Sequence, residues 1–150
     1  MKIRIIAVGR QKASPAKELC EEYLKRMKWD VSLKEINSPK GATSAQEAPL
    51  ILQELEKQQS LVVALDERGE TLASPAFAKK LSGWQDSAPA NTVTFLIGGA
   101  DGFDNQVREK SGFLLSFGKQ TWPHMLVRVM LLEQLYRAQQ IIAGHPYHRQ

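Results

Sequence analysis

Apolar residues follow two alternating patterns along the chain, and these patterns predict strands and helices in turn. Short apolar runs that end at glycine or polar residues predict strands at residues 2–8, 31–36, 61–65, 92–97 and 113–117. Between these runs, apolar residues recur three and four positions apart and predict helices near residues 15–27, 50–57, 75–84, 104–110 and 125–143. Serine followed by proline, at Ser14 and again at Ser74, predicts where two of the helices begin. The run at 61–65 stops at Asp66, and residues 67–70 are expected to turn the chain.

The order of these elements predicts the fold class. The runs at 61–65 and 93–97 have no polar alternation, which is typical of strands that are covered on both faces. Because a predicted helix separates each strand from the next, the economical architecture is α/β, with a mainly parallel sheet in a three-layer sandwich. The 150 residues suit a single domain spanning 1–150 with no linker.

The last predicted helix carries more apolar residues than one buried face needs. They are Leu126, Val129, Met130, Leu132, Leu135, Tyr136, Ile141 and Ile142. One apolar face can cover the sheet, and a second face would be exposed in a monomer. The surplus predicts a homodimer, because exposed apolar patches usually mark association sites. The alternative is a central helix that is buried on all sides.

Composition limits the compartment and the partners. The single cysteine, Cys20, lies on the apolar stripe of its helix and is expected to be a small core residue. No N-terminal run has the flanks of a signal peptide, and no run approaches about 18 apolar residues, so we expect a cytoplasmic protein that spans no membrane. The net charge is +4, and residues 1–40 hold ten basic and five acidic residues. A basic part can attract a polyanion such as RNA, although many proteins that bind no nucleic acid carry a similar charge.

Glycine and polar residues gather where the predicted strands end, which is where ligands bind in open parallel sheets. Segment 98–102 reads Gly-Gly-Ala-Asp-Gly, and its backbone can approach a ligand closely, although it can equally be a plain turn. It is neither the dinucleotide fingerprint nor a P-loop. Leu65 is positioned to line a cofactor pocket, and the Asp66 carboxylate is more simply explained as a turn cap. The loop 118–123 leads into the last helix and offers further backbone contacts.

The three histidines do not form a recognisable metal motif. His145 and His148 are not at a helical zinc spacing, and neither a second cysteine nor an acidic ligand pattern accompanies Cys20 and His124. We therefore expect no metal.

The residues after the last helix instead suit RNA. Tyr147 can stack on an unpaired base, and Arg149 can pair with phosphate, while His148 adds a titratable imidazole between them. The alternative is that the tail is a disordered end.

Several segments together resemble one known family over the whole chain. They are Leu96–Gly102, Trp122-Pro123-His124, Leu126–Val129, Glu133–Ala138 and the terminal His145-Pro146-Tyr147-His148-Arg149. With these motifs the chain is similar to the RlmH family, the bacterial ribosomal large-subunit pseudouridine N3-methyltransferases of the SPOUT superfamily. The resemblance implies a C-terminal trefoil knot, a topology that is rare among proteins, and a family without a separate RNA-binding domain.

The resemblance also implies the cofactor, the partners and the reaction. S-adenosylmethionine would lie in the knot of a homodimer, held mainly by the backbone of strand-end segments. On this chain those positions are Leu65, Gly98 and Gly118-Lys119-Gln120-Thr121-Trp122-Pro123. The implied substrate is a pseudouridine in the 23S rRNA of the assembled ribosome, which is methylated at N3.

The roles of individual side chains follow from this chemistry. A sulfonium methyl group is already a strong electrophile, so the protein must mainly align it with N3 and remove the N3 proton. The candidate bases are His124 and His148, and Arg149 or Arg128 can stabilise negative charge on the uracil carbonyls. The candidate RNA-binding residues are Tyr147, His148, Arg149 and Arg128. A catalytically silent RNA-binding module remains the main alternative, and a nucleotide-binding oxidoreductase is disfavoured because the glycine fingerprint is absent.

Overall fold

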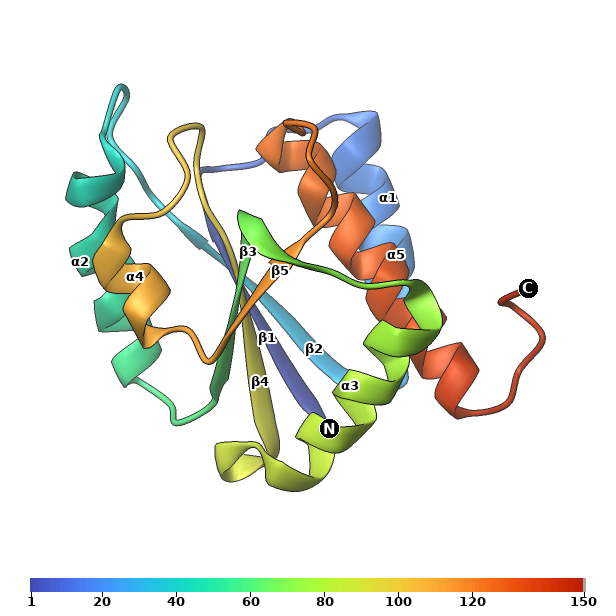
Figure 1. The fold of residues 1–150 in the computed structure, drawn as a ribbon. Helices are drawn as coiled ribbons and strands as arrows, with labels where there is room; N and C mark the ends of the chain where they lie inside the picture. Colours follow the sequence, from blue (N-terminus) through green and yellow to red (C-terminus); the bar gives the residue numbers. More distant parts are fainter. Residues whose placement is uncertain (150) are drawn as a thin grey trace.

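The computed structural model describes residues 1–149 and shows one parallel sheet (Figure 1). Its strands are β1 (Lys2–Val8), β2 (Asp30–Ile36), β3 (Leu61–Thr71), β4 (Thr92–Ile97) and β5 (Phe113–Ser116). They lie in the order β2-β1-β4-β3-β5, with parallel pairing throughout. Each lies where the sequence predicted a strand. The runs at 61–65 and 93–97 belong to the interior strands β3 and β4, as their lack of polar alternation predicted.

Helices cover both faces of this sheet and complete the three predicted layers (Figure 1). On one face lie α1 (Pro15–Arg26), α3 (Ser74–Ser87) and α5 (His124–Ile142), and on the other lie α2 (Ser44–Glu56) and α4 (Asn105–Lys110). A short 3-10 turn, Pro89–Asn91, connects α3 to β4. Each face has its own apolar core. Cys20 is buried in the first of these, as predicted, and burial raises the pKa of its thiol, which disfavours the reactive thiolate.

The two Ser-Pro signals mark helix starts, but only one serine acts as a cap. The Ser14 hydroxyl accepts a hydrogen bond of 3.2 Å from the backbone amide of Lys17, at the first turn of α1. At α3 the N-cap position belongs to Ala73, and Ser74 is the first helical residue. The Ser74 hydroxyl donates instead to Oε1 of Gln134 on α5, over 2.7 Å. This serine therefore joins α3 to α5.

Strand β3 is longer than the sequence predicted, and the expectation of a turn at 67–70 is wrong. After Leu65 the strand bulges outward and then rejoins β5, so that Leu65 and Glu70 both lie opposite Leu115. Gly69 makes this close return possible, because a Cβ there would lie 2.6 Å from the Leu114 carbonyl. The bulge turns Asp66 towards the loops at the carboxyl end of the sheet.

Helix α5 buries most of its apolar surface inside its own chain. Val129 and Leu132, which the sequence made candidates for a second apolar face, are only 9% and 0% exposed. The apolar side chains that do reach the surface of this helix include Leu126 and Ile142. Among residues 1–149, no helix is both long enough and apolar enough to cross a membrane.

Candidate functional site

The carboxyl ends of the strands enclose a cavity of about 410 Å³. Its walls come from the loops after β3, β4 and β5 and from the first turn of α5. The lining residues include Leu65, Asp66, Gly98, Gly102, Gly118, Gln120, Thr121, Trp122 and His124. The three segments that the sequence marked as cofactor-binding therefore converge on one cavity. Lys119 and Pro123 belong to the same loop as its lining residues but are exposed beside the cavity.

The glycine loop after β4 is folded tightly on itself. The Gly102 amide donates to the Gly99 carbonyl over 3.1 Å, and Gly102 has a φ of 71°, which favours glycine. A Cβ on Gly98 would lie 3.1 Å from the Gly102 carbonyl oxygen and 3.3 Å from the Phe103 ring. The loop thus needs its first glycine in order to close, and its backbone forms one wall of the cavity.

Glu47 of α2 lies against this loop and was missed by the sequence analysis. The side chain is buried, and the Ser38 hydroxyl donates to its Oε2 over 2.6 Å. A Cβ on Gly99 would lie 3.1 Å from the same oxygen. Glu47 therefore binds the loop after β2 and leaves no room for a side chain on Gly99 of the glycine loop.

His124 begins α5 at the edge of the cavity, beside the end of β1. Gly9, with a φ of 96°, turns the chain there, and a Cβ on it would lie 4.0 Å from Nε2 of His124. The imidazole therefore lies between the end of β1 and the cavity that it lines. Of the three histidines, it is the one that lines this cavity.

Arg128 lies one turn further along α5, and the structure corrects the expectation that it is open to RNA. Its side chain has no exposed surface. It donates to Oε2 of Glu35 over 2.6 Å and to the carbonyl of Gly9 over 2.7 Å, with a longer contact of 3.3 Å to the Val8 carbonyl. A guanidinium buried in this way cannot reach RNA in this conformation. It docks α5 onto the ends of β1 and β2 and so holds His124 at the cavity.

Burial and hydrogen bonding act on the pKa of Glu35 in opposite directions. Burial by itself would raise this pKa, but hydrogen bonds from Arg128 and from the Gln11 amide bring it below its ordinary value. The carboxylate is therefore charged at neutral pH, and it offsets the cost of burying the arginine.

Asp66 and Arg108 form a second ion pair, in the wall of the cavity. Oδ1 of Asp66 accepts from the Arg68 amide over 2.9 Å, so the side chain caps the backbone of the β3 bulge and not the turn that the sequence predicted. Its Oδ2 also accepts from Nε of Arg108 over 2.7 Å. This contact ties the β3 bulge to α4. A separation of 42 residues between the partners leaves no local sequence signal for it.

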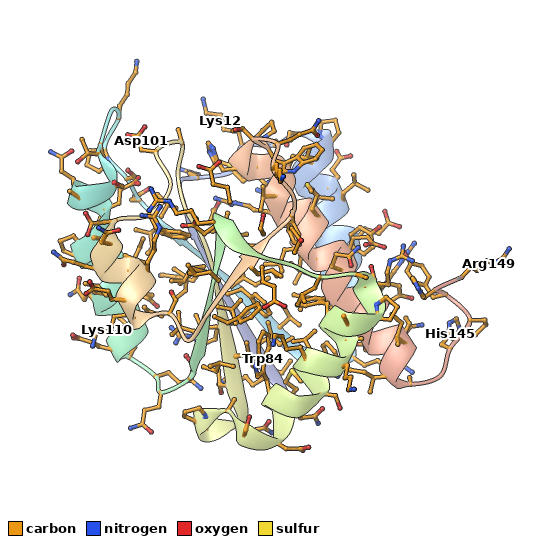
Figure 2. The ribbon with its side chains drawn as sticks, viewed as in Figure 1. Lys12, Trp84, Asp101, Lys110, His145 and Arg149 are labelled. Atoms are coloured by element: carbon orange, nitrogen blue, oxygen red, sulfur yellow. The ribbon has the colours of Figure 1, made fainter. Side chains whose placement is uncertain are left out.

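The C-terminal tail lies away from this cavity, against the far end of α5. The Tyr147 ring packs edge-on against Tyr136 with 4.9 Å between ring centroids, and its hydroxyl donates to Glu133 over 3.3 Å. Figure 2 shows Arg149 and His145 at the right of the view, whereas Asp101 of the glycine loop lies at its upper left. Within one chain, the structure does not bring Tyr147, His148 and Arg149 to the cavity.

A second, apolar hollow of about 580 Å³ lies between α1, α3 and α5. Its lining includes Leu19, Tyr23, Phe77 and Met130. Leu19 is 44% exposed, and Leu126, further along the α5 surface, is 39% exposed. Among residues 1–149, no three side chains of histidine, cysteine, aspartate or glutamate are placed to share a metal ion.

The fold and the sequence together define the class of protein. Residues 1–148 match the model of a family described as "Predicted SPOUT methyltransferase", and this chain belongs to that family. Relatives of matching length are named "Ribosomal RNA large subunit methyltransferase H". The protein of that name from Rhodospirillum centenum is 50% identical, and that from Paramagnetospirillum magneticum 47%, each over 99% of both chains.

A solved structure shows the same fold at low sequence identity. A probable methylase family protein from Haemophilus influenzae Rd KW20 matches with a TM-score of 0.63 and 15% identity, over 99% of this chain and 70% of that chain. The observed fold confirms the α/β prediction, and the family match over residues 1–148 confirms the expected superfamily.

Proposed function

We propose that this chain transfers a methyl group from S-adenosylmethionine to N3 of a pseudouridine in the 23S rRNA of the assembled ribosome. The observation that carries the proposal is the convergence of three strand-end loops on one cavity in a SPOUT methyltransferase chain. The names of the full-length relatives support ribosomal RNA of the large subunit as the substrate. The choice of pseudouridine, of N3 and of the assembled ribosome rests on the motif resemblance. A substrate of this kind also supports a cytoplasmic location.

The cavity suits S-adenosylmethionine in size and in lining. Its volume of about 410 Å³ falls within the range of roughly 300–1,000 Å³ for small-molecule sites. Gly98, Gly118 and their neighbours offer backbone donors and acceptors, and Leu65 offers an apolar wall. When bound, the cofactor supplies the electrophilic methyl group. The residues proposed to hold it are Leu65, Gly98 and the loop from Gly118 to Pro123.

Exposed basic residues stand at the same end of the sheet and support an RNA substrate. Arg10 and Lys12 follow β1, Lys40 follows β2, and Lys119 follows β5. Figure 2 shows Lys12 and Asp101 of the glycine loop together at the upper edge of the molecule. Positive charge around a cavity attracts the phosphates of a polyanion and steers it towards the opening.

We also propose that the protein is a homodimer of single-domain subunits, and that the tail of one subunit serves the pocket of the other. The exposed Leu19 and Leu126 and the apolar hollow give α1 and α5 an unfilled apolar surface. A partner subunit would cover that surface. It would also supply Tyr147, His148 and Arg149, which lie too far from the cavity of their own chain.

Association is tested by light scattering at high micromolar concentration. The unmodified protein is expected to have the mass of a dimer, and Leu19→Glu the mass of a folded monomer, because an unpaired charge in an apolar interface is costly. Leu50→Glu is the matched control. Leu50 is 37% exposed on α2, which lies on the opposite layer, so this variant should remain dimeric. A monomer mass for the unmodified protein would exclude the shared site.

The proposed reaction is tested by titration and by transfer. Calorimetry should detect binding of S-adenosylmethionine and none of NADH, and the protein with labelled cofactor should methylate 23S rRNA in 70S ribosomes that lack the modification. Binding of neither ligand would favour the RNA-binding module, and binding of NADH alone would favour an oxidoreductase. Cofactor binding without transfer to any ribosomal substrate would contradict the proposed target.

A further inference from the structure

The tail presents His148 in a defined hydrogen-bonding state. Its Nδ1 lies 3.1 Å from a terminal nitrogen of the Arg137 guanidinium. A guanidinium has only donors, so in this contact the imidazole nitrogen must accept. A hydrogen bond between these two atoms therefore requires an unprotonated Nδ1, which leaves the proton of a neutral ring on Nε2. If Nδ1 also carried a proton, two donors would face each other and the contact would be lost.

Arg137 is itself held firmly in place. Its Nε donates to Oε1 of Glu133 over 3.0 Å, one turn earlier on α5, and this pair raises the pKa of Arg137. The Tyr147 ring covers the guanidinium, with Cζ 4.9 Å from the ring centroid. Burial and the charge of Glu133 raise the pKa of Tyr147 to about 12, so its hydroxyl stays protonated and donates to the same carboxylate. Every partner of the guanidinium thus favours its present orientation.

We infer that Arg137 and Glu133 are positioning residues that hold His148 as the neutral imidazole protonated on Nε2, so that His148 donates a hydrogen bond to the substrate and is not the base. The tautomer rests on the geometry of this chain alone, and the donor role rests also on the proposed function.

With His148 as a donor, a different group must accept the proton that leaves N3 of the substrate. When N3 loses its proton, negative charge spreads to the two carbonyl oxygens beside it, and an Nε2–H group directed at one of them stabilises that charge. The N3 proton must then go to another acceptor, and His124 is the histidine that lines the cavity. N3 forms its new bond to the methyl carbon as the bond from that carbon to sulfur breaks and S-adenosylhomocysteine is released.

The tautomer can be read directly by long-range ¹H–¹⁵N correlation on the full-length protein labelled with ¹⁵N-histidine. His148→Gln identifies the His148 signals by their loss. The unmodified protein is expected to show Nδ1 at the shift of an unprotonated nitrogen and Nε2 at that of a protonated one. Arg137→Met should convert this state into a mixture of tautomers. The inference fails if Nδ1 is protonated in the unmodified protein, and that measurement stands even if the variant does not fold.

A matched control separates this effect from a general loss of charge. Arg26 pairs with Glu22 four residues earlier on α1, just as Arg137 pairs with Glu133 on α5. Arg26→Met should leave the His148 signals unchanged. An Arg137→Met variant that folds and keeps the His148 tautomer of the unmodified protein would also overturn the inference.

Ribosome methylation then distinguishes a donor from a base at position 148. Glutamine can donate but cannot take a proton at neutral pH, and glutamate can only accept. His148→Gln should keep kcat within about tenfold of the unmodified protein, the loss expected for one weakened hydrogen bond, and His148→Glu should lose much more. The reverse order would make His148 the base. If the unmodified protein methylates no ribosomal substrate, the proposed function fails while the tautomer result stands.

Discussion

Gly98→Val is expected to abolish binding of S-adenosylmethionine. A Cβ at this position meets the Gly102 carbonyl at 3.1 Å and the Phe103 ring at 3.3 Å, and valine adds two methyl groups in that space. The glycine loop must then open, and the backbone wall of the cavity moves with it. The cofactor then loses the backbone contacts that this wall is proposed to make. Calorimetric titration of the folded variant measures the loss.

Gly83→Val is the matched control for this variant. Gly83 lies in α3, and a Cβ there meets no atom of the described residues within 4 Å. The control should bind the cofactor as the unmodified protein does, although valine has a different helix propensity from glycine. If Gly98→Val also binds normally while folded, the glycine loop is not part of the cofactor site.

Removal of residues 146–150 is expected to abolish methyl transfer to ribosomes while leaving cofactor affinity nearly unchanged. The tail lies against α5 and contributes nothing to the cavity of its own chain. It nevertheless holds Tyr147, His148 and Arg149, the groups proposed to contact RNA. Arg149→Ala should give a milder defect that is largest at low salt and shrinks as the salt concentration rises, because one phosphate contact is lost. Full methylation by the truncated protein would show that the tail has no part in the reaction.

Mixing two inactive variants tests whether the tail acts on the partner. A subunit with Gly98→Val keeps its tail and lacks a pocket, and the tail-deleted subunit keeps its pocket. A mixed dimer should recover activity in one of its two sites if the tail acts across the interface. No recovery, in a mixture shown to exchange subunits, would mean that the tail serves the pocket of its own chain.

The sequence was sufficient to predict the layers and most of the cavity. Apolar runs and three- to four-residue spacing depend on local burial, and they located most strands and helices to within about three residues. The exceptions are α2, which begins at Ser44 and not near residue 50, and β3, which continues past residue 65 to Thr71. Strand ends in a parallel sheet lie at one edge, so Leu65, Gly98 and the loop after β5 could be expected to meet. Here they do share one cavity with His124. The glycines of segment 98–102 by themselves were only weak evidence for a cofactor site.

The structural features that the sequence did not predict depend on contacts between residues that are distant in the chain. Residues 66–71 have the composition of a turn, yet β5 offers them an edge to pair with, so β3 resumes after its bulge. Arg128 looked like a surface charge, because Glu35 and the β1 carbonyls that bury it are about a hundred residues away. Tyr147 was expected to offer its ring to an unpaired base, and no local pattern indicates that Glu133 accepts from its hydroxyl and that Tyr136 packs against its ring.

The contacts of Arg128 also determine when the pocket can form during synthesis. They join residues 119 and 120 positions apart, between the first strand and the last helix. In a growing polypeptide the carbonyls of Val8 and Gly9 therefore lack this partner until α5 has been translated. His124 cannot settle at the cavity before then, because Arg128 anchors the turn that carries it. No nascent fragment that ends before α5 contains a finished cavity, so we expect affinity for the methyl donor to appear only after α5 has been translated.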